Sequence, residues 1–201
     1  MIKIHSVFAL GCILSVSLIV SPVSAEEPEL KPIFNGTDFT GWKLPDNNIW
    51  WKVENGEIVC QSGPKKKGST LWTEKEYEDF IFETEFKFDG KGDSGIFLRT
   101  TKQQVQIGIS GSLKRDMTGS MYIPGKGYPS EASGVKELLK INEWNVMKVV
   151  VKRATYDIFL NGKLVSTFTG QTPPKKGRIG LQLHGNKDMR IDFRNIKLAE
   201  L

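Results

Sequence analysis

Apolar and polar residues alternate in short runs along most of this chain, and glycine, asparagine, aspartate and proline separate the runs. Successive side chains of a β-strand point to opposite faces, so each run predicts a strand with one apolar and one polar face. The alternation is clearest near the C-terminus, where Ile179, Leu181 and Leu183 are interleaved with small or polar residues. The predicted strands cover residues 50–53, 57–60, 70–73, 80–88, 95–100, 104–109, 144–153, 156–160, 163–169, 178–184 and 190–198.

Turns and breaks between these runs indicate the fold class. Asn55-Gly56 and Asn161-Gly162 each join two alternating runs, which is typical of a type I′ hairpin. A short helix is predicted over residues 134–141. Many short strands with few helices predict one all-β domain, an antiparallel β-sandwich. Residues 110–133 form the longest irregular piece, which predicts a functional loop or a disordered one.

The N-terminus has the pattern of a secretory signal peptide. Lys3 precedes an apolar run over residues 7–20, and Val23-Ser24-Ala25 is a small-residue cleavage pattern. We therefore expect a signal peptide over residues 1–25, a polar tether over 26–32 and the domain over 33–201, in a secreted or periplasmic protein. Lipidation at Cys12 is a weaker alternative. The apolar run is short for a membrane span, so no stable membrane insertion is expected.

Charge and composition limit the classes of partner and bound ion that this protein can have. The formal net charge of +5 is too modest to indicate nucleic acid, and Lys65-Lys66-Lys67 is typical of a solvated loop. After signal cleavage Cys60 and His184 are the last residues of their types, which excludes an internal disulfide and a zinc site of the usual spacing. We predict no metal and no cofactor, although the oxygen ligands of residues 46–48 leave a loop calcium site open.

The polar faces of four predicted strands carry groups that can hydrogen-bond a polar ligand. Arg99 lies on the first and Gln106 on the second, Gln182 and His184 lie on the third, and Arg194 lies on the last. If these strands are neighbours, the five side chains share one face of a sheet. That face is either a ligand site or the solvated side of an ordinary sandwich.

Six blocks in order resemble a known family. They are Phe34-Asn-Gly-Thr-Asp-Phe-Thr-Gly-Trp42, Asp93-Ser-Gly-Ile-Phe-Leu-Arg99, Gln104-Val-Gln-Ile107, Thr118-Gly-Ser-Met-Tyr122, Glu143-Trp-Asn145 and the C-terminal Gly-Leu-Gln-x-His followed by Phe-Arg-Asn-Ile. Together they resemble the 3-keto-disaccharide hydrolase domain family, from about residue 32 to 198. The resemblance implies a concanavalin A-like jelly roll, of the lectin and glucanase superfamily, and hydrolysis of sugars already oxidised at C3 in bacterial envelopes.

The implied reaction suggests roles for the polar residues. A C3 ketone acidifies the proton on C2, and removal of that proton allows the C1 substituent to leave and water to add. His184 is the predicted base because its ordinary pKa lies near neutrality. Arg99 and Arg194 are predicted to stabilise the enolate. The predicted substrate-binding residues, for a carbohydrate or glycoside, are Gln106, Gln182, Tyr122, Asp93 and Asp192.

Departures from the family pattern leave two other functions open. Where the family strand reads Glu-x-Gln-Ile-x-Asp, Gln104 and Ile109 replace the two acids, and Asp93 replaces the usual asparagine. The chain could thus be a non-catalytic carbohydrate-binding module. It could also be a conventional glucanase that uses Glu83 and Glu85, which lie two apart on one strand face, about 7 Å along it.

Overall fold

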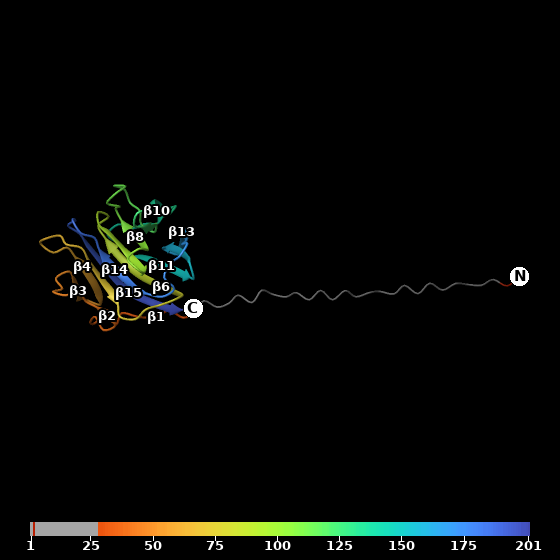
Figure 1. Cartoon of the computed structure of the whole chain (residues 1–201), viewed down its shortest axis with the longest axis horizontal. Helices are drawn as coiled ribbons and strands as arrows, with labels where there is room; N and C mark the ends of the chain where they lie inside the picture. The colour runs from red at the N-terminus through yellow and green to blue at the C-terminus, as the bar shows by residue number, and fades with distance from the viewer. Residues whose placement is uncertain (1, 3–27) are drawn as a thin grey trace.

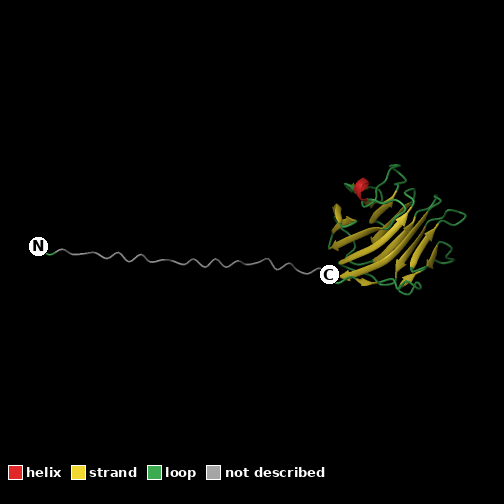
Figure 2. Ribbon diagram, turned by 180° about the vertical axis from the view of Figure 1, so that it is seen from behind, coloured by secondary structure: helices red, strands yellow, loops and turns green. Residues whose placement is uncertain are grey.

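The computed structural model describes Ile2 and residues 28–201, and the predicted signal peptide lies outside them apart from Ile2. The described part of the chain contains fifteen strands and one short helix, α1 (Val135–Leu138), joined by turns and loops. Figures 1 and 2 show the strands stacked in two curved layers with α1 at one edge. The strands are β1 (Lys31–Pro32), β2 (Trp42–Lys43), β3 (Trp51–Glu54), β4 (Glu57–Gln61), β5 (Ser69–Thr73), β6 (Phe80–Phe88), β7 (Asp93–Arg99), β8 (Gln104–Gly108), β9 (Met121–Ile123), β10 (Gly127–Ser130), β11 (Asn145–Lys152), β12 (Thr155–Leu160), β13 (Lys163–Thr169), β14 (Arg178–Leu183) and β15 (Arg190–Glu200).

The two layers are antiparallel sheets. Sheet A has the order β13-β12-β11-β6-β15-β4-β3, with β1 added beside β15, and sheet B has the order β10-β9-β8-β7-β14-β5-β2. Strand pairs within both sheets are antiparallel. The predicted all-β antiparallel sandwich, a concanavalin A-like jelly roll, is therefore confirmed.

The core lies between the sheets and is made by one face of each strand. In β6 the buried face carries four phenylalanines, Phe80, Phe82, Phe86 and Phe88. In β14 the predicted apolar face, Ile179, Leu181 and Leu183, is buried with exposures of 1% or less. Because side chains alternate along each strand, the polar residues of β7, β8 and β14 are directed to the opposite face of sheet B.

Several predicted details are confirmed and others differ. Both predicted hairpin turns have positive φ at their two central residues, as a type I′ turn requires. The helix is shorter than predicted. The supposed irregular piece, residues 110–133, contains β9 and β10, and the supposed tether contributes β1 to sheet A. Within the described residues, no helix is long and apolar enough to cross a membrane.

The first and last strands of the domain are paired. Lys31 faces Leu198 across the β1–β15 ladder, and the Leu201 amide donates a hydrogen bond to the Asp79 carbonyl at the end of the domain. Both ends of the folded domain therefore meet at the same end of the sandwich, where β6 begins and β7 finishes.

Gly95 in the middle of β7 is required by the side chains that lie over it. A Cβ at this position would lie 2.4 Å from the Gln104 Nε2 and 2.6 Å from the carbonyl oxygen of Val105. These distances are well inside van der Waals contact, and the second group is backbone that cannot move aside. The absence of a side chain at Gly95 thus allows the polar side chains of β8 to cover β7.

We predict that Gly95→Ala lowers the free energy of unfolding by about 2 kcal/mol, because the new methyl group forces backbone and side-chain shifts. Chemical denaturation of the purified protein measures this. Gly170→Ala is the matched control, since its Cβ would have no neighbour nearer than 3.5 Å. Equal stability of the two variants would contradict the packing argument.

Candidate functional site

A cavity of about 400 Å³ lies on the outer face of sheet B. Five residues singled out from the sequence line it together, which confirms their proximity. β7 and β8 form its floor, β9, β10 and the loop after β8 form one wall, and the end of β14 forms the other. The lining residues are Asp93, Gln104, Gln106, Ser110, Gly111, Ser112, Tyr122, Tyr128, Gln182 and His184.

Three glutamine side chains and one carboxylate form a hydrogen-bond chain across the floor. The Gln104 Nε2 donates to the Oε1 atoms of Gln106, at 2.9 Å, and Gln182, at 3.0 Å. Gln106 then donates from Nε2 to the Asp93 Oδ1 at 2.8 Å. Because an amide oxygen only accepts and an amide nitrogen only donates, donation runs outward from Gln104, to Gln182 on one side and through Gln106 to the carboxylate on the other. Gln182 keeps its Nε2 for donation to a ligand.

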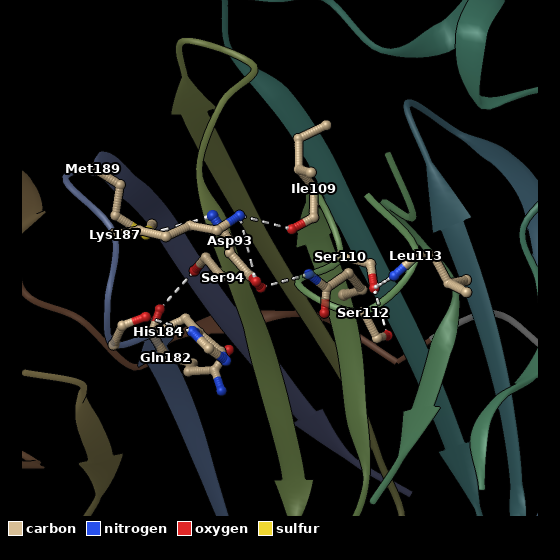
Figure 3. A network of polar contacts seen from close by, with 12 residues as sticks. Asp93, Ser94, Ile109, Ser110, Ser112, Leu113, Gln182, His184, Lys187 and Met189 are labelled. Carbon is tan, nitrogen blue, oxygen red and sulfur yellow. Dashed lines mark hydrogen bonds and ion pairs between the residues drawn. The ribbon is translucent and has the colours of Figure 1, made fainter. Parts of the chain in front are cut away.

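Asp93 is the buried acid of this cavity. Asp93 is 3% exposed, and no hydrogen bond from the described residues reaches its Oδ2. Lys187 Nζ lies 3.6 Å from Oδ2 and donates a hydrogen bond to the Ile109 carbonyl at 3.2 Å. Figure 3 shows the lysine reaching across to both groups. Leaving a carboxylate oxygen without a hydrogen bond is costly, so this oxygen is a natural acceptor for a ligand.

His184 lies at the exposed end of β14, immediately beside this acid (Figure 3). Its backbone amide donates to the Asp93 carbonyl at 3.3 Å, and its Nδ1 lies 2.8 Å from the Gly185 carbonyl. A carbonyl partner at Nδ1 selects the tautomer that carries the proton there, which leaves Nε2 available. The Ser94 hydroxyl holds the strand just before His184 by donating to the Gln182 carbonyl at 2.6 Å.

Two tyrosines close the cavity on the side of β9 and β10. The rings of Tyr122 and Tyr128 have centroids 5.1 Å apart. Burial raises the pKa of the Tyr128 phenol, a hydrogen bond with Ser110 opposes this, and the Asp93 charge raises it again. The net pKa lies above the ordinary value, so the phenol is a proton-bearing hydrogen-bond donor at neutral pH.

A second cavity, of about 600 Å³, adjoins the first and shares Gln182 and His184 with it. Trp72 of β5 lies in its lining and stacks on Phe97, with ring centroids 5.6 Å apart and an interplanar angle of 16°. Gly180 lies between these residues in the sheet, and a Cβ there would lie 2.7 Å from the Trp72 ring. The second cavity thus has an apolar ring beside the polar floor.

The sequence matches the family of 3-keto-α-glucoside-1,2-lyase-like domains over residues 29–199. The chain belongs to this family. The predicted family is thereby confirmed, under a description that names the elimination step. No curated protein sequence gives a significant match.

Three solved structures illustrate the fold. A protein of Parabacteroides distasonis, provisionally named a glycosyl hydrolase, is 25% identical with a TM-score of 0.67, and the match covers 87% of this chain and 100% of that chain. A carbohydrate-binding module of Bacillus subtilis is 16% identical with a TM-score of 0.54, covering 81% and 98%. A β-glucanase of Bacillus licheniformis is 16% identical with a TM-score of 0.56, covering 84% and 95%. The last two show the fold alone, whereas family membership indicates a carbohydrate-active protein.

The prediction that β15 contributes to the same face was wrong. Its polar residues lie on the outer face of sheet A, because β15 pairs with β4 and β6. Arg194 donates to Glu85 at 2.7 Å and lies 4.0 Å from the Trp144 ring centroid. Asp192 accepts from Arg190 at 2.8 Å. Neither residue reaches the cavity, since the core separates the two outer faces.

Arg99 also lies outside the cavity, contrary to the prediction. It ends β7, at the opposite end from Asp93, so about 20 Å of strand separates the two residues. Its φ of 64° takes the backbone out of the extended conformation and redirects the side chain. The guanidinium is buried, pairs with Asp79 at 3.0 Å, and donates to the carbonyls of Arg153 and Pro174. Arg99 therefore ties together three segments of the fold.

The glucanase dyad lies on the outer face of sheet A, where the register places Glu83 opposite Lys197 and Glu85 opposite Arg194. Burial would raise the pKa of Glu85, but hydrogen bonds from Asn195 and Arg194 outweigh it and hold the pKa below its usual value. A carboxylate held ionised in this way is a poor proton donor. The structure gives the dyad no support as a general acid and nucleophile.

Metal ligands do not gather within the described residues, where no group of three histidine, cysteine, aspartate or glutamate side chains is suitably placed. In the loop proposed for calcium, the Asn48 Oδ1 accepts from the backbone amides of Trp50 and Trp51, and its Nδ2 donates to the Trp51 carbonyl. Asn48 therefore organises the start of β3.

Sequence reasoning missed four residues of the two cavities and their surroundings. Gln104 was considered only as a departure from the family pattern, although its position on the polar face of β8 was a usable signal. Trp72 is one of five tryptophans, and nothing in the sequence distinguishes it from the other four. Tyr128 and Lys187 lie in segments with no periodic pattern, so no sequence signal pointed to them.

We predict that Arg99→Ala lowers the free energy of unfolding by roughly 3 kcal/mol, because it removes the ion-pair partner of Asp79 and the donor to two carbonyl groups. Arg194→Ala, a half-exposed ion-pair arginine, should cost about 1 kcal/mol or less. Urea denaturation of both variants measures the difference. A larger loss for Arg194→Ala would show that the structural role of Arg99 has been overstated.

Proposed function

We propose that this protein cleaves 3-keto-glycosides by removing the C2 proton and eliminating the C1 substituent, with water adding afterwards where hydrolysis is completed. The observation that carries the proposal is the cavity on sheet B, in which a buried carboxylate with a free oxygen lies beside a histidine and several neutral donors. Membership of the family supports the substrate class. The N-terminal pattern supports secretion or a periplasmic location.

The reaction requires three kinds of groups, and the cavity offers each. The developing enolate oxygen needs donors, which the Tyr128 phenol and the Gln182 amide can supply. The C2 proton needs an acceptor, and the departing C1 oxygen needs a proton. Neutral donors suit an enolate because they become stronger partners as negative charge develops in a site largely removed from water.

His184 is suited to the departing oxygen. The sequence suggested this residue as the base, but its place where the two cavities meet supports a different role. If the 3-keto ring occupies the smaller cavity and the leaving group occupies the one that Trp72 lines, the bond that breaks lies beside the imidazole. In its protonated form the imidazole can donate from Nε2 to the leaving oxygen.

A non-catalytic carbohydrate-binding module is the second candidate. It is favoured by Gln104, an amide on the cavity floor at the position where the family pattern implies an acid. The polar floor of the first cavity and Trp72 in the adjoining one would suit binding of a sugar ring without any bond cleavage.

We expect the purified protein to release product from 3-keto-sucrose or 3-keto-trehalose and to leave the unoxidised disaccharides intact, because only the ketone acidifies C2. Mass spectrometry and chromatography follow the products, and an elimination product is one water lighter than the hydrolysed sugar. Binding of the keto form without turnover would favour the module, and cleavage of the plain disaccharide would contradict the elimination chemistry.

We further expect His184→Ala to slow cleavage of a 3-keto-disaccharide by roughly 100-fold, since an alcohol leaving group needs a proton. The same variant should lose much less activity on a 3-keto-glucoside of p-nitrophenol, whose oxygen leaves without protonation. Steady-state kinetics on both substrates separate the cases. Equal losses on the two would contradict the role as proton donor.

A further inference from the structure

On the floor of the first cavity, the hydrogen bonds that start at Gln104 and pass through Gln106 end on the carboxylate of Asp93. Gln104 uses its Nε2 on the oxygens of both Gln106 and Gln182, so Gln106 must turn its own Nε2 toward Asp93. An ionised carboxylate accepts hydrogen bonds at both oxygens, so it can accept the last hydrogen bond of the series, from Gln106. Oδ1 of Asp93 is thereby fixed, and Oδ2 is left without a hydrogen bond.

That free oxygen lies at the cavity wall. A Cβ placed on Gly111, a lining residue, would lie 3.3 Å from the Asp93 Oδ2. Lys187 approaches to 3.6 Å, close enough to neutralise the charge but too far for a hydrogen bond. The carboxylate is therefore held by one oxygen, while the other is buried beside Gly111 and Lys187 without a hydrogen bond and meets a bound molecule when one of these two residues moves aside.

We propose that Asp93 is the base that removes the C2 proton, and that the direction of the glutamine chain is what places the carboxylate there. This inference rests on the proposed elimination reaction. The three glutamines act as positioning residues, and Asp93 is the catalytic residue that touches the substrate.

The step balances as follows. Oδ2 forms a bond to the C2 hydrogen, and the electrons of the C2–H bond move into a C2=C3 bond as the ketone becomes an enolate. When the enolate reverts to the ketone, those electrons form the C1=C2 bond and expel the C1 oxygen, which takes a proton from His184. The proton on Asp93 passes to water, or returns to C2 when water adds to C1, so no oxidant or reductant is needed.

The direction of donation between positions 104 and 93 can be reversed by exchanging the amide and the acid at these two positions. Gln104→Glu alone would place a second carboxylate on the floor and turn both neighbouring amides toward it, leaving the Gln106 oxygen against Asp93. Asp93→Asn with Gln104→Glu would restore donation of opposite direction between the two positions, because the new amide at position 93 would then donate to Gln106; only the longer bond from Gln104 to the Ser94 carbonyl, 3.3 Å, would stay lost. The two positions should therefore be strongly coupled in stability.

The first experiment measures proton abstraction directly. A 3-keto-1,5-anhydroglucitol has no leaving group, so in D₂O its C2 hydrogen can only be exchanged, and NMR follows the exchange. Wild type should exchange it, whereas Asp93→Asn should lose roughly 100-fold or more of the rate. Asp192→Asn is the matched control, a buried acid on the outer face of sheet A, and should exchange like wild type.

The second experiment tests the direction of the chain without using activity. By thermal unfolding, Gln104→Glu should melt roughly 5 °C or more below wild type, and the double variant should regain most of that loss. Asp93→Asn should melt within roughly 3 °C of wild type, because its Oδ1 still accepts from Gln106. If the melting-temperature change of the double variant equals the sum of the two single-variant changes, the proposed direction of the hydrogen bonds is overturned.

The outcomes separate this inference from the reaction on which it rests. If wild type neither cleaves a 3-keto-disaccharide nor exchanges the C2 hydrogen of the probe, the proposed function fails, and the melting temperatures alone still decide the direction of the chain. If wild type is active and Asp93→Asn keeps its exchange rate, the base assignment is overturned and the elimination reaction stands. Loss of exchange in Asp93→Asn with native stability supports Asp93 as the base.

Discussion

The site depends on one constraint, which is that polar groups buried on a sheet surface must all find partners. On the outer face of sheet B the side chains of Gln104 and Gln106 are almost fully buried, and each unpaired amide atom would cost free energy. They satisfy one another in a row that crosses β14, β8 and β7. Glycine at position 95 makes room for this row, so a backbone feature of β7 and the side-chain order above it are parts of one solution.

The same constraint links two substitutions that looked independent in the sequence. The amide at position 104 and the acid at position 93 are linked through Gln106, and each is compatible with the other because of the direction in which the hydrogen bonds are donated. Although Gln104 and Ile109 stand where the family pattern has two acids, the cavity has a carboxylate on the neighbouring strand, in Asp93.

Much of the fold was predictable from period-two alternation, because burial of one strand face dictates that pattern. Eleven of the fifteen strands in the described residues followed from it, and the Asn-Gly pairs between alternating runs predicted both type I′ turns. The cavity followed only in part, since alternation tells which face a side chain takes but not which sheet the strand joins. Arg194 was therefore misplaced through β15, and Arg99 through a positive φ at the end of β7. Tyr128 comes from a segment whose pairing depends on distant contacts.

The pairing of β1 with β15 has a consequence for how the protein can be held. β1 begins and β15 finishes at the end of the sandwich where Leu201 and Asp79 meet, whereas Asp93 begins β7 at the other end. An eleven-residue strand such as β15 spans roughly 35 Å, so the cavity lies about one sandwich length away from either terminus. A support, an anchor or a neighbouring domain joined at either terminus would leave the mouth of the cavity facing outward, open to incoming sugar.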